Sequence, residues 1–391
     1  MLILLSVFEG AARWYDAKEA EEFLSVQDNA ESFGSFPSML QYGKRLGYIQ
    51  ERLTGTSMGG GAYEPYQVVS LKPNYRFQFK NVEYIHNSLG FRGEDIVVPK
   101  RPGTFRVVII GGSSVQGGYN ERWTISYYLA NKLKATHENV EVINAGVVGA
   151  MSQNELAILQ IKVIDLKPDL AIIFDGRNDL YYSVTPNWQN RQGDPYFGHK
   201  KALDALINEP SLFTLSTNLA RYIAKQSSLV TRIFRLLARR GIDPVYPKKV
   251  QFNSRAIDTY LDNLKLIKAT LEVEGIRGLI AFQPTLGYCK NNLTQYEQSI
   301  TDYLIKNEES DWFERVNEAW PKMGERVSSL PASRQVRFVN LACIFRDVEE
   351  TAYIDSVHYT PKGAEVIASV ISDQVKSFYA ETMREHGAMA R

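Results

Sequence analysis

Residue types that together activate a hydroxyl group occur far apart in this chain. Ser113 lies in the glycine-rich segment GGSSVQGG, whereas Asp355 and His358 lie in DSVHYTPKG. A serine hydroxyl becomes an effective nucleophile when a histidine accepts its proton and a carboxylate fixes the tautomer of that histidine. The spacing of three residues allows the Asp355 carboxylate to reach the His358 imidazole within one turn. We therefore expect Ser113, His358 and Asp355 to form a nucleophilic triad.

Attack on an acyl carbonyl also requires hydrogen-bond donors for the oxyanion of the tetrahedral intermediate. The candidate donors are the backbone N–H groups of Ser113 and Gly149 and the side-chain amide of Asn178. Each of these residues follows an apolar run typical of a strand, so the three could converge on one point. Asn178 could instead only stabilise its own turn, and Gly149 could serve only the backbone conformation.

Purely structural roles are the alternative for the triad residues as well. Ser113 could cap the helix that follows it, and His358 could flank a helix without taking part in chemistry. The remaining histidines lack a comparable acidic partner and are expected to be surface or structural residues: His86, His137, His199 and His386.

The elements that must position these residues alternate along the chain after residue 104. Apolar, β-branched runs alternate with amphipathic stretches, which is typical of βαβ units and a parallel sheet covered on both faces. We expect strands at 106–110, 140–144, 169–175, 278–282 and 336–341. We expect helices at 123–135, 152–166, 254–273 and 361–383. The candidate site residues follow these strands, at the edge where open parallel sheets bind ligands.

Two parts of the chain fall outside this alternation. Residues 1–100 are expected to form an N-terminal extension, helical from about residue 11 to 52 and then glycine-rich. Residues 180–252 are interpreted as an insertion in the main domain of residues 101–391. A segment of the insertion, residues 218–241, carries six basic residues and no acidic ones: Arg221, Lys225, Arg232, Arg235, Arg239 and Arg240. Either a helix with a solvated basic face or a lid or membrane-surface contact fits this pattern.

Four sequence blocks resemble those of the SGNH/GDSL hydrolase family. Their order matches the family between about residues 101 and 380, with a break at the insertion. The matching residues are the block I serine Ser113, the block II glycine Gly149, the block III asparagine Asn178 in its G-x-N-D setting, and the block V pair Asp355 and His358. The resemblance implies a flavodoxin-like three-layer α/β/α sandwich and a serine esterase that forms an acyl-enzyme. An O-acyltransferase with the same triad is the alternative.

The first block departs from the family pattern at one position. Gly112 stands where the family commonly has aspartate, although many extracytoplasmic relatives read G-G-S. The variation leaves Ser114 as a rival nucleophile. The segment HNSLGFRGEDI, residues 86–96, also resembles such relatives; we expect it to pack against the domain, and its Arg92 could approach the active-site mouth. These relatives suggest an O-acyl group, such as O-acetyl, on a carbohydrate, and an extracytoplasmic or periplasmic location.

Two other motifs are interpreted as having no catalytic or nucleotide-binding role. Ser57 fits G-x-S-x-G, but a helix-like stretch rather than a strand precedes it, so we expect a flexible loop. The segment GGSSVQGG lacks the central glycine of a dinucleotide fingerprint, and the second strand ends in Asn144 rather than in an acidic residue.

Composition excludes further classes. The chain has 45 Lys+Arg and 44 Asp+Glu, a formal charge of +1, which predicts no general attraction to nucleic acid. Cys289 and Cys343 are the only cysteines and lack the spacing of metal ligands, although one disulfide between them is possible. We expect neither a metal nor an organic cofactor, because protein groups alone activate the serine.

The N-terminal run MLILLSVF is too short to span a membrane and lacks the basic start of a signal peptide. It could begin an ordinary buried helix, or it could end a longer membrane anchor that starts upstream of Met1.

Several aromatic residues near the expected site loops could either stack on sugar rings or simply pack: Tyr119, Trp123, Tyr181, Tyr182 and Trp188. A non-catalytic carbohydrate-binding or assembly protein is a third functional class, and the intact triad argues against it. The acyl group, its alcohol, hydrolysis versus transfer, and the oligomeric state are not determined by these patterns.

Overall fold

The computed structural model describes most of the expected main domain and short parts of the N-terminal extension. The described residues are 7–12, 14, 33–40, 43, 61–62, 70–79, 82–118, 121–136, 139–182, 255–306 and 310–389. Ser57 and the basic segment 218–241 lie outside them, so the expectations for both stay predictions. No helix among the described residues combines the length and apolar character needed to cross a membrane.

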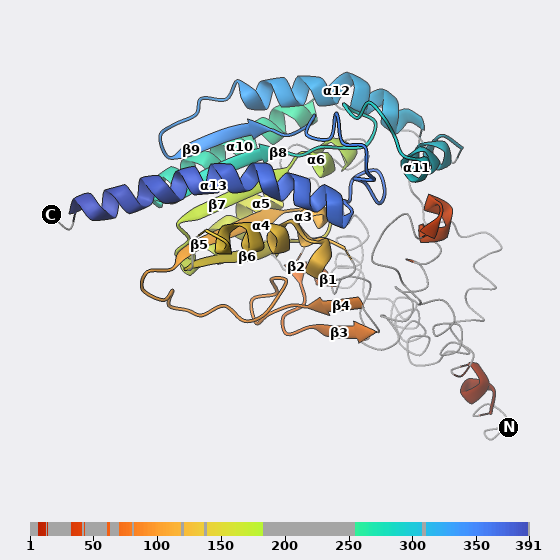
Figure 1. Cartoon of the computed structure of the whole chain (residues 1–391), viewed down its shortest axis with the longest axis horizontal. Coiled ribbons are helices and arrows are strands. Elements are labelled where there is room, and N and C mark those ends of the chain that lie inside the picture. The colour runs from red at the N-terminus through yellow and green to blue at the C-terminus, as the bar shows by residue number, and fades with distance from the viewer. Residues whose placement is uncertain are drawn as a thin grey trace, which may run out of the picture.

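A parallel sheet forms the centre of the molecule (Figure 1). Its five strands are β5 (Phe105–Gly111), β6 (Val140–Gly146), β7 (Leu170–Asp175), β8 (Arg277–Phe282) and β9 (Val336–Asn340). The spatial order is β6-β5-β7-β8-β9, and all neighbouring pairs are parallel. The chain turns to opposite sides of β5 when it forms β6 and β7. This reversal of strand order is the topological switch point at which flavodoxin-like sheets bind ligands.

Helices cover both faces of the sheet, as Figure 1 shows. One core contains side chains of α4 (Ile125–Lys134), α11 (Gln295–Lys306) and α13 (Pro361–Met389). The other contains side chains of α5 (Ser152–Ile158), α10 (Arg255–Val273) and α12 (Ser310–Ser328). The fold is therefore a three-layer α/β/α sandwich, as predicted.

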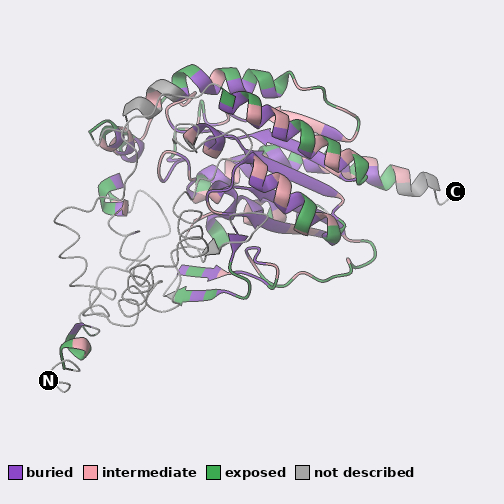
Figure 2. Ribbon diagram, turned by 180° about the vertical axis from the view of Figure 1, so that it is seen from behind, coloured by how far each residue is buried: buried purple, intermediate pink, exposed green. Residues whose placement is uncertain are grey.

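The central strands supply both cores because successive side chains point to opposite faces of a sheet. On β5, Val107 and Ile109 belong to one core, and Val108 and Ile110 to the other. All four are fully buried, and Figure 2 shows the same burial in the centre of the sheet, whereas the edge strand β9 is mostly intermediate. The continuous apolar runs of the sequence follow from this double coverage.

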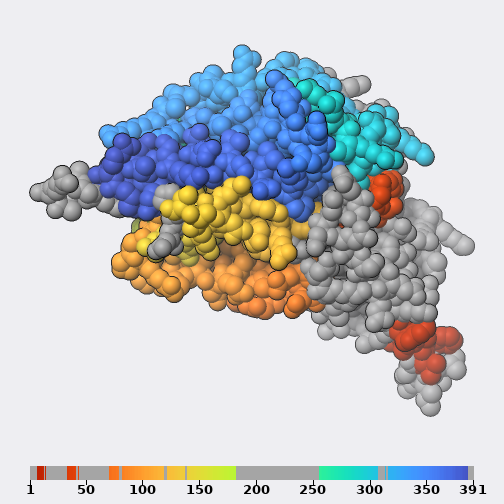
Figure 3. Space-filling model, in the orientation of Figure 1, coloured from red at the N-terminus to blue at the C-terminus, as the bar shows by residue number. Residues whose placement is uncertain are grey.

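The predicted strands and helices of the main domain are confirmed, with small differences at their ends. The helix predicted at 152–166 is α5 continued by a π-helical turn (Leu159–Val163) and a 3-10 turn (Ile164–Leu166). The helix predicted at 123–135 is α4, preceded by a 3-10 turn (Glu121–Trp123). In Figure 3, α4 in yellow lies directly beside α13 in blue.

Smaller strand pairs precede the central sheet. β3 (Arg76–Phe79) and β4 (Val82–Ile85) form an antiparallel pair, as do β1 (Gly61–Ala62) and β2 (Ser70–Leu71). The N-terminal extension also reaches the core, because Phe36 and Met39 are buried in the same cluster as α11 and α13. The Phe36 N–H donates to Ser299 Oγ of α11 at 2.9 Å.

Candidate active site

The nucleophile candidate follows the central strand directly. Ser113 is the first residue of the short helix α3 (Ser113–Gln116), and Gly112 is its N-cap. The capping position is thus taken by a residue without a side chain, and the Ser113 hydroxyl lies against His358 Nε2 instead. The structure therefore argues against the alternative that Ser113 merely caps a helix.

The three triad candidates meet in one hydrogen-bonded line. The Ser113 Oγ lies 2.7 Å from His358 Nε2, and His358 Nδ1 lies 2.6 Å from Asp355 Oδ2. Asp355 and His358 belong to the loop between β9 and α13. With the proton of the neutral ring on Nδ1, Nε2 is free to accept the Ser113 proton. The geometry is that of a serine activated by a histidine base.

The neighbouring His358 ring and local hydrogen bonds hold the Asp355 carboxylate in its ionised form. Oδ1 accepts the backbone N–H groups of Val357 and His358, both at 2.8 Å. Burial acts to raise the pKa of Asp355, but the neighbouring His358 and these two N–H donors outweigh it and lower the pKa to about 2. The carboxylate therefore carries its charge at neutral pH, where it can stabilise an imidazolium.

Two of the three oxyanion candidates, Gly149 and Asn178, lie on segments that contact each other. Asn178 is in the first turn of α6 (Arg177–Tyr182), which follows β7, and its Nδ2 donates to Ala150 O at 2.7 Å. Gly149 precedes Ala150 and has a left-handed φ of 74°. An amide nitrogen carries two hydrogens, so Asn178 retains a second donor beyond the one given to Ala150. The Asn178 amide thus ties α6 to the Gly149 loop.

The surroundings of Gly112 explain why the first block departs from the family pattern at this position. A Cβ atom at this position would lie 2.6 Å from Asn178 Nδ2 and 3.3 Å from Ala150 O. The Asn178 amide therefore occupies the space that a side chain at residue 112 would need. The same proximity shows that the amide lies next to the backbone that carries Ser113.

A buried network lies behind the oxyanion candidates. Asp179 accepts the Ser152 N–H at 3.0 Å and the Ser152 hydroxyl at 2.6 Å, and Asn263 Nδ2 donates to the same hydroxyl at 2.9 Å. Ser152 begins α5 directly after the Gly149 loop. Asn178 and Asp179 thus bind neighbouring residues, Ala150 and Ser152, on the C-terminal side of Gly149. The Asp of G-x-N-D was the only signal that could have pointed to this network.

Two further carboxyls extend the network. Burial is the largest cause that raises the pKa of each of the three acids, to about 7 for Asp179, to about 6 for Asp175, and upward for Glu155. Asp175 also accepts the Tyr260 hydroxyl at 2.7 Å. Neither Glu155 oxygen has a donor among the described residues while the group is ionised. A protonated Glu155 can donate to Asp175, so burial and mutual repulsion favour a proton on this pair.

The rival nucleophile has a different environment. Ser114 is 6% exposed, and its hydroxyl lies 3.4 Å from Gln283 Nε2. The hydrogen-bonded line to His358 starts at Ser113 and not at Ser114.

Arg92 takes a packing position. Its side chain is buried and donates to Gln116 O at 2.8 Å and to Gly118 O at 2.9 Å, in the turn that follows α3. Arg92 therefore holds the C-terminal end of α3 and the turn after it, a packing role as expected of the segment that precedes β5.

The remaining sequence candidates are distributed as follows. Trp123 is 3% exposed and belongs to the core, so it offers no ring face to a sugar. Tyr181 is half-buried under the Arg177 guanidinium, which lies 4.3 Å from the ring centre. His86 is buried, and burial lowers its pKa to about 4, as suits a structural histidine. The structure does not describe the side chains of Tyr119, Tyr182, Trp188, His137, His199 and His386.

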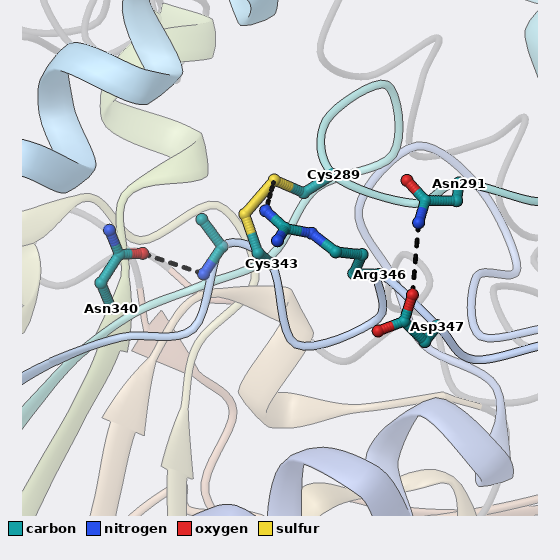
Figure 4. Close-up of a disulfide and its surroundings, with 7 residues drawn as sticks. Cys289, Asn291, Asn340, Cys343, Arg346 and Asp347 are labelled. Atoms are coloured by element: carbon teal, nitrogen blue, oxygen red, sulfur yellow. Dashed lines mark hydrogen bonds between the residues drawn. A yellow bond between two sulfur atoms is a disulfide. The ribbon is translucent and has the colours of Figure 1, made fainter.

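Within the described part of the chain, no group of three or more acidic, histidine or cysteine side chains is arranged to hold a metal ion. The two cysteines are joined in a disulfide between the loops that follow β8 and β9 (Figure 4).

Comparison with known proteins gives a family match. A model of the GDSL-like lipase/acylhydrolase family matches residues 109–366. No curated protein matches the chain.

Solved structures of similar topology include several esterases. An acetyl xylan esterase, AlAXEase, is 14% identical, with 69% of this chain and 99% of that chain covered and a TM-score of 0.37. The acetylxylan esterase Axe2 from Geobacillus stearothermophilus is 17% identical, with 68% and 91% covered and a TM-score of 0.34. A GDSL-like lipase from Bacteroides thetaiotaomicron is 12% identical, with 72% and 92% covered and a TM-score of 0.37. These scores are too low to support an inference about substrate.

Proposed function

This chain belongs to the GDSL-like lipase/acylhydrolase family and acts on ester bonds, and we propose that it does so through an acyl-enzyme formed on Ser113. The observation that carries the proposal is the line of hydrogen bonds at 2.7 Å and 2.6 Å through His358. A serine, a histidine and an ionised carboxylate in this arrangement are sufficient for nucleophilic catalysis without a cofactor.

In the proposed first step, Ser113 Oγ attacks the ester carbonyl while its proton moves to His358 Nε2. Asp355 stabilises the resulting imidazolium. The tetrahedral intermediate then expels the alcohol, which takes the proton from Nε2, and the acyl group remains on Ser113. In the second step, water attacks the carbonyl of the acyl-enzyme while His358 Nε2 accepts a proton from it. The second intermediate expels Ser113 Oγ, which takes the proton back from Nε2, so that the products are a carboxylic acid and the free serine.

The oxyanion of both intermediates needs donors that are in place before charge develops. We assign this role to the Ser113 and Gly149 N–H groups and to the second amide hydrogen of Asn178. The contact between Asn178 and Ala150 supports the assignment, because it holds two of these donors on adjoining segments.

We further propose that the substrate is an O-acyl group, such as O-acetyl, on a carbohydrate. The resemblance of the G-G-S block and of residues 86–96 to extracytoplasmic relatives supports this proposal. An extracytoplasmic or periplasmic location is part of it, with the N-terminal run or the segment 218–241 as the proposed membrane contact. The Cys289–Cys343 disulfide supports this location, since such bonds persist mainly in oxidising compartments.

The test is labelling with a fluorophosphonate, followed by peptide mapping and by kinetics with p-nitrophenyl acetate. We expect the label on Ser113, and we expect Ser113→Ala to lower turnover by about 10⁴-fold or more. Ser114→Ala is the matched control and should retain the label and most of the activity. A label on Ser114, or full turnover by Ser113→Ala, would contradict the mechanism. Acylated acceptor in excess over free acid would instead identify an O-acyltransferase.

A further inference from the structure

The loop that carries Asp355 and His358 is long and has little regular structure of its own. It runs from the end of β9 at Asn340 to the start of α13 at Pro361, and its only β-type pairing is an isolated bridge between Tyr353 and Tyr359. A triad needs its groups held to within a fraction of an ångström. The contacts that hold this loop must therefore come from elsewhere in the fold.

One neighbouring segment, residues 283–297, supplies many of them. This segment, which we call the support segment, follows β8 and includes the start of α11. The Thr285 hydroxyl and the Leu286 N–H both donate to Ser356 O, at 3.0 Å and 3.1 Å. The Tyr296 hydroxyl donates to Ile354 O at 2.9 Å. Both neighbours of Asp355 along the chain are thus held by the support segment.

The support segment contains a buried carboxylate, that of Glu297, which is fully inaccessible to solvent. Its Oε1 accepts the N–H groups of Ala352 at 2.9 Å and Tyr353 at 3.2 Å. Its Oε2 accepts the Thr294 N–H at 3.0 Å and lies 3.3 Å from Lys290 Nζ. A buried carboxylate is costly unless it is paired and fully hydrogen-bonded, and Glu297 meets both conditions.

Lys290, the cation of this ion pair, also binds the loop that carries Asp355 and His358. Lys290 Nζ donates to Val348 O at 2.7 Å and to Glu350 O at 2.9 Å, and its side chain is 1% exposed. Lys290 is adjacent to Cys289, whose disulfide joins the support segment to Cys343 at the start of the same loop. Asn291 adds an N–H bond to Arg346 O and a side-chain bond to Asp347, as Figure 4 shows for the latter. The ion pair and the disulfide therefore act between the same two segments.

We propose that Glu297 is a positioning residue of the triad: it fixes the backbone at Ala352 and Tyr353, and so places Asp355 and His358 opposite Ser113. The inference rests on the proposed function of Ser113. Glu297 does not touch the substrate in this scheme. It acts by keeping the Asp355 carboxylate in line with the imidazole.

The main test variant is Glu297→Gln, which keeps the shape of the side chain but replaces one acceptor oxygen with a donor. That NH₂ group must face either backbone N–H groups or the Lys290 ammonium, so the loop has to shift. We expect kcat with p-nitrophenyl acetate to fall by about 10²-fold and KM to stay within about twofold. We also expect the acid limb of the kcat/KM profile to move to lower pH, because an imidazolium without an aligned carboxylate is less stable.

A milder variant, Tyr296→Phe, covers the case in which Glu297→Gln does not fold. It removes one hydroxyl that donates to Ile354 O, and we expect kcat to fall by about fivefold with the same direction of shift in the acid limb. Tyr353→Phe is the matched control: its hydroxyl lies in the same loop, is buried and has no hydrogen-bond partner among the described residues. This control should leave kcat and the profile unchanged.

A second control separates stability from positioning. Glu141 pairs with the buried Arg106 at 2.6 Å, far along β5 and β6 from Ser113, so Glu141→Gln should lower the melting temperature without moving the profile. If Glu297→Gln behaves like Glu141→Gln, Glu297 has only a structural role and the inference is overturned. If Glu297→Gln does not fold and Tyr296→Phe behaves like Tyr353→Phe, the support segment does not position the triad, and the inference is overturned as well. These outcomes do not depend on whether Ser113→Ala is inactive, so a failure of the proposed function is detected separately.

Discussion

At the scale of single residues, Gly112 shows how a departure from a family pattern can follow from one contact. The Asn178 amide and Ala150 O fill the space beside its Cα. The Asn178 amide is also a proposed oxyanion donor, so its position matters for rate more than for folding. A side chain at residue 112 should therefore affect catalysis and stability unequally.

We predict that Gly112→Ala lowers kcat by about 10²-fold, the usual effect of losing one oxyanion donor. The added methyl group pushes the flexible Asn178 amide away, whereas the backbone conformation at residue 112, with φ of −79°, suits alanine. The free energy of unfolding should fall only by the contribution of one hydrogen bond, that between Asn178 and Ala150, which is about 1 kcal/mol. Steady-state kinetics and thermal denaturation of the purified variant measure both quantities.

A double-mutant cycle tests the cause. If Gly112→Ala acts through Asn178, the double variant with Asn178→Ala should be no slower than Asn178→Ala alone. Additive losses would mean that residue 112 affects the site by another route.

At the scale of elements, the first turn of α6 and the loop after β9 carry the site, and each is tied to its neighbours by a few specific bonds. In α6, Asn178 binds Ala150 and Asp179 binds Ser152, so one helical turn holds the segment that runs from the Gly149 loop into α5. Arg177 of the same turn donates to Ser356 Oγ at 3.2 Å. The Gly149 loop and the loop after β9 are thus connected through α6.

The disulfide adds a covalent tie between the loops after β8 and β9. Its cysteines are 54 residues apart in sequence. We predict that Cys289→Ala with Cys343→Ala lowers the free energy of unfolding by about 2 to 4 kcal/mol, because closing a loop of this length restricts the unfolded chain. Urea unfolding with and without reductant measures the effect.

The double variant provides its own control, since reductant should not change its stability any further. The reduced wild type should match the double variant. An unfolding midpoint of the wild type that is insensitive to reduction would contradict the prediction.

At the scale of the whole molecule, the buried acids make stability depend on pH. The pKa values of Asp175 and Asp179 are raised from 3.8 to about 6 and about 7, so the folded protein holds protons that the unfolded chain has already released. The contribution of these two groups to the free energy of unfolding is fully present below pH 3.8 and is lost as the pH rises to about 7. Asp355 has the opposite sign: its pKa of about 2 gives a contribution that is present above pH 3.8 and lost as the pH falls through about 2.

We predict that Asp179→Asn makes the free energy of unfolding less dependent on pH. Asparagine stays neutral, so the variant should escape the loss of about 1.4 kcal/mol per pH unit that one such group causes between its unfolded and folded pKa values. The stability of Asp179→Asn relative to wild type should rise between pH 4.5 and pH 7. Urea unfolding at several pH values gives the difference.

Asp169→Asn is a suitable control for that series. Asp169 accepts the Arg106 N–H at 2.6 Å and pairs with Lys100 at the opposite end of β7, and it lies outside the buried acid network. Its replacement should not reproduce the pH-dependent gain. Parallel pH dependences for wild type and Asp179→Asn would show that Asp179 is ionised in the folded protein throughout this range.

Local sequence patterns were sufficient to predict the sheet and most of its helices. The runs at 106–110 and 169–175 became β5 and β7 because continuous burial on both faces leaves a continuous apolar signature. The helices α11 and α12 were not predicted. α12 contains Pro321 within a strongly charged stretch, and its burial depends on packing against β9 and α10 rather than on local preference.

The same distinction, between what local sequence indicates and what only packing decides, applies to the site. Ser113, Asp355 and His358 were identifiable from the sequence because their chemistry requires particular residue types at strand ends, and the structure brings them within hydrogen-bonding distance. The sequence alone also determined the domain's α/β class. Only the tertiary structure decided that Glu297 and Lys290 pair beside the loop after β9, that three acids share a buried site, and that Cys289 is bonded to Cys343. Such contacts depend on the distance between remote segments after folding, and neither composition nor periodicity records that distance.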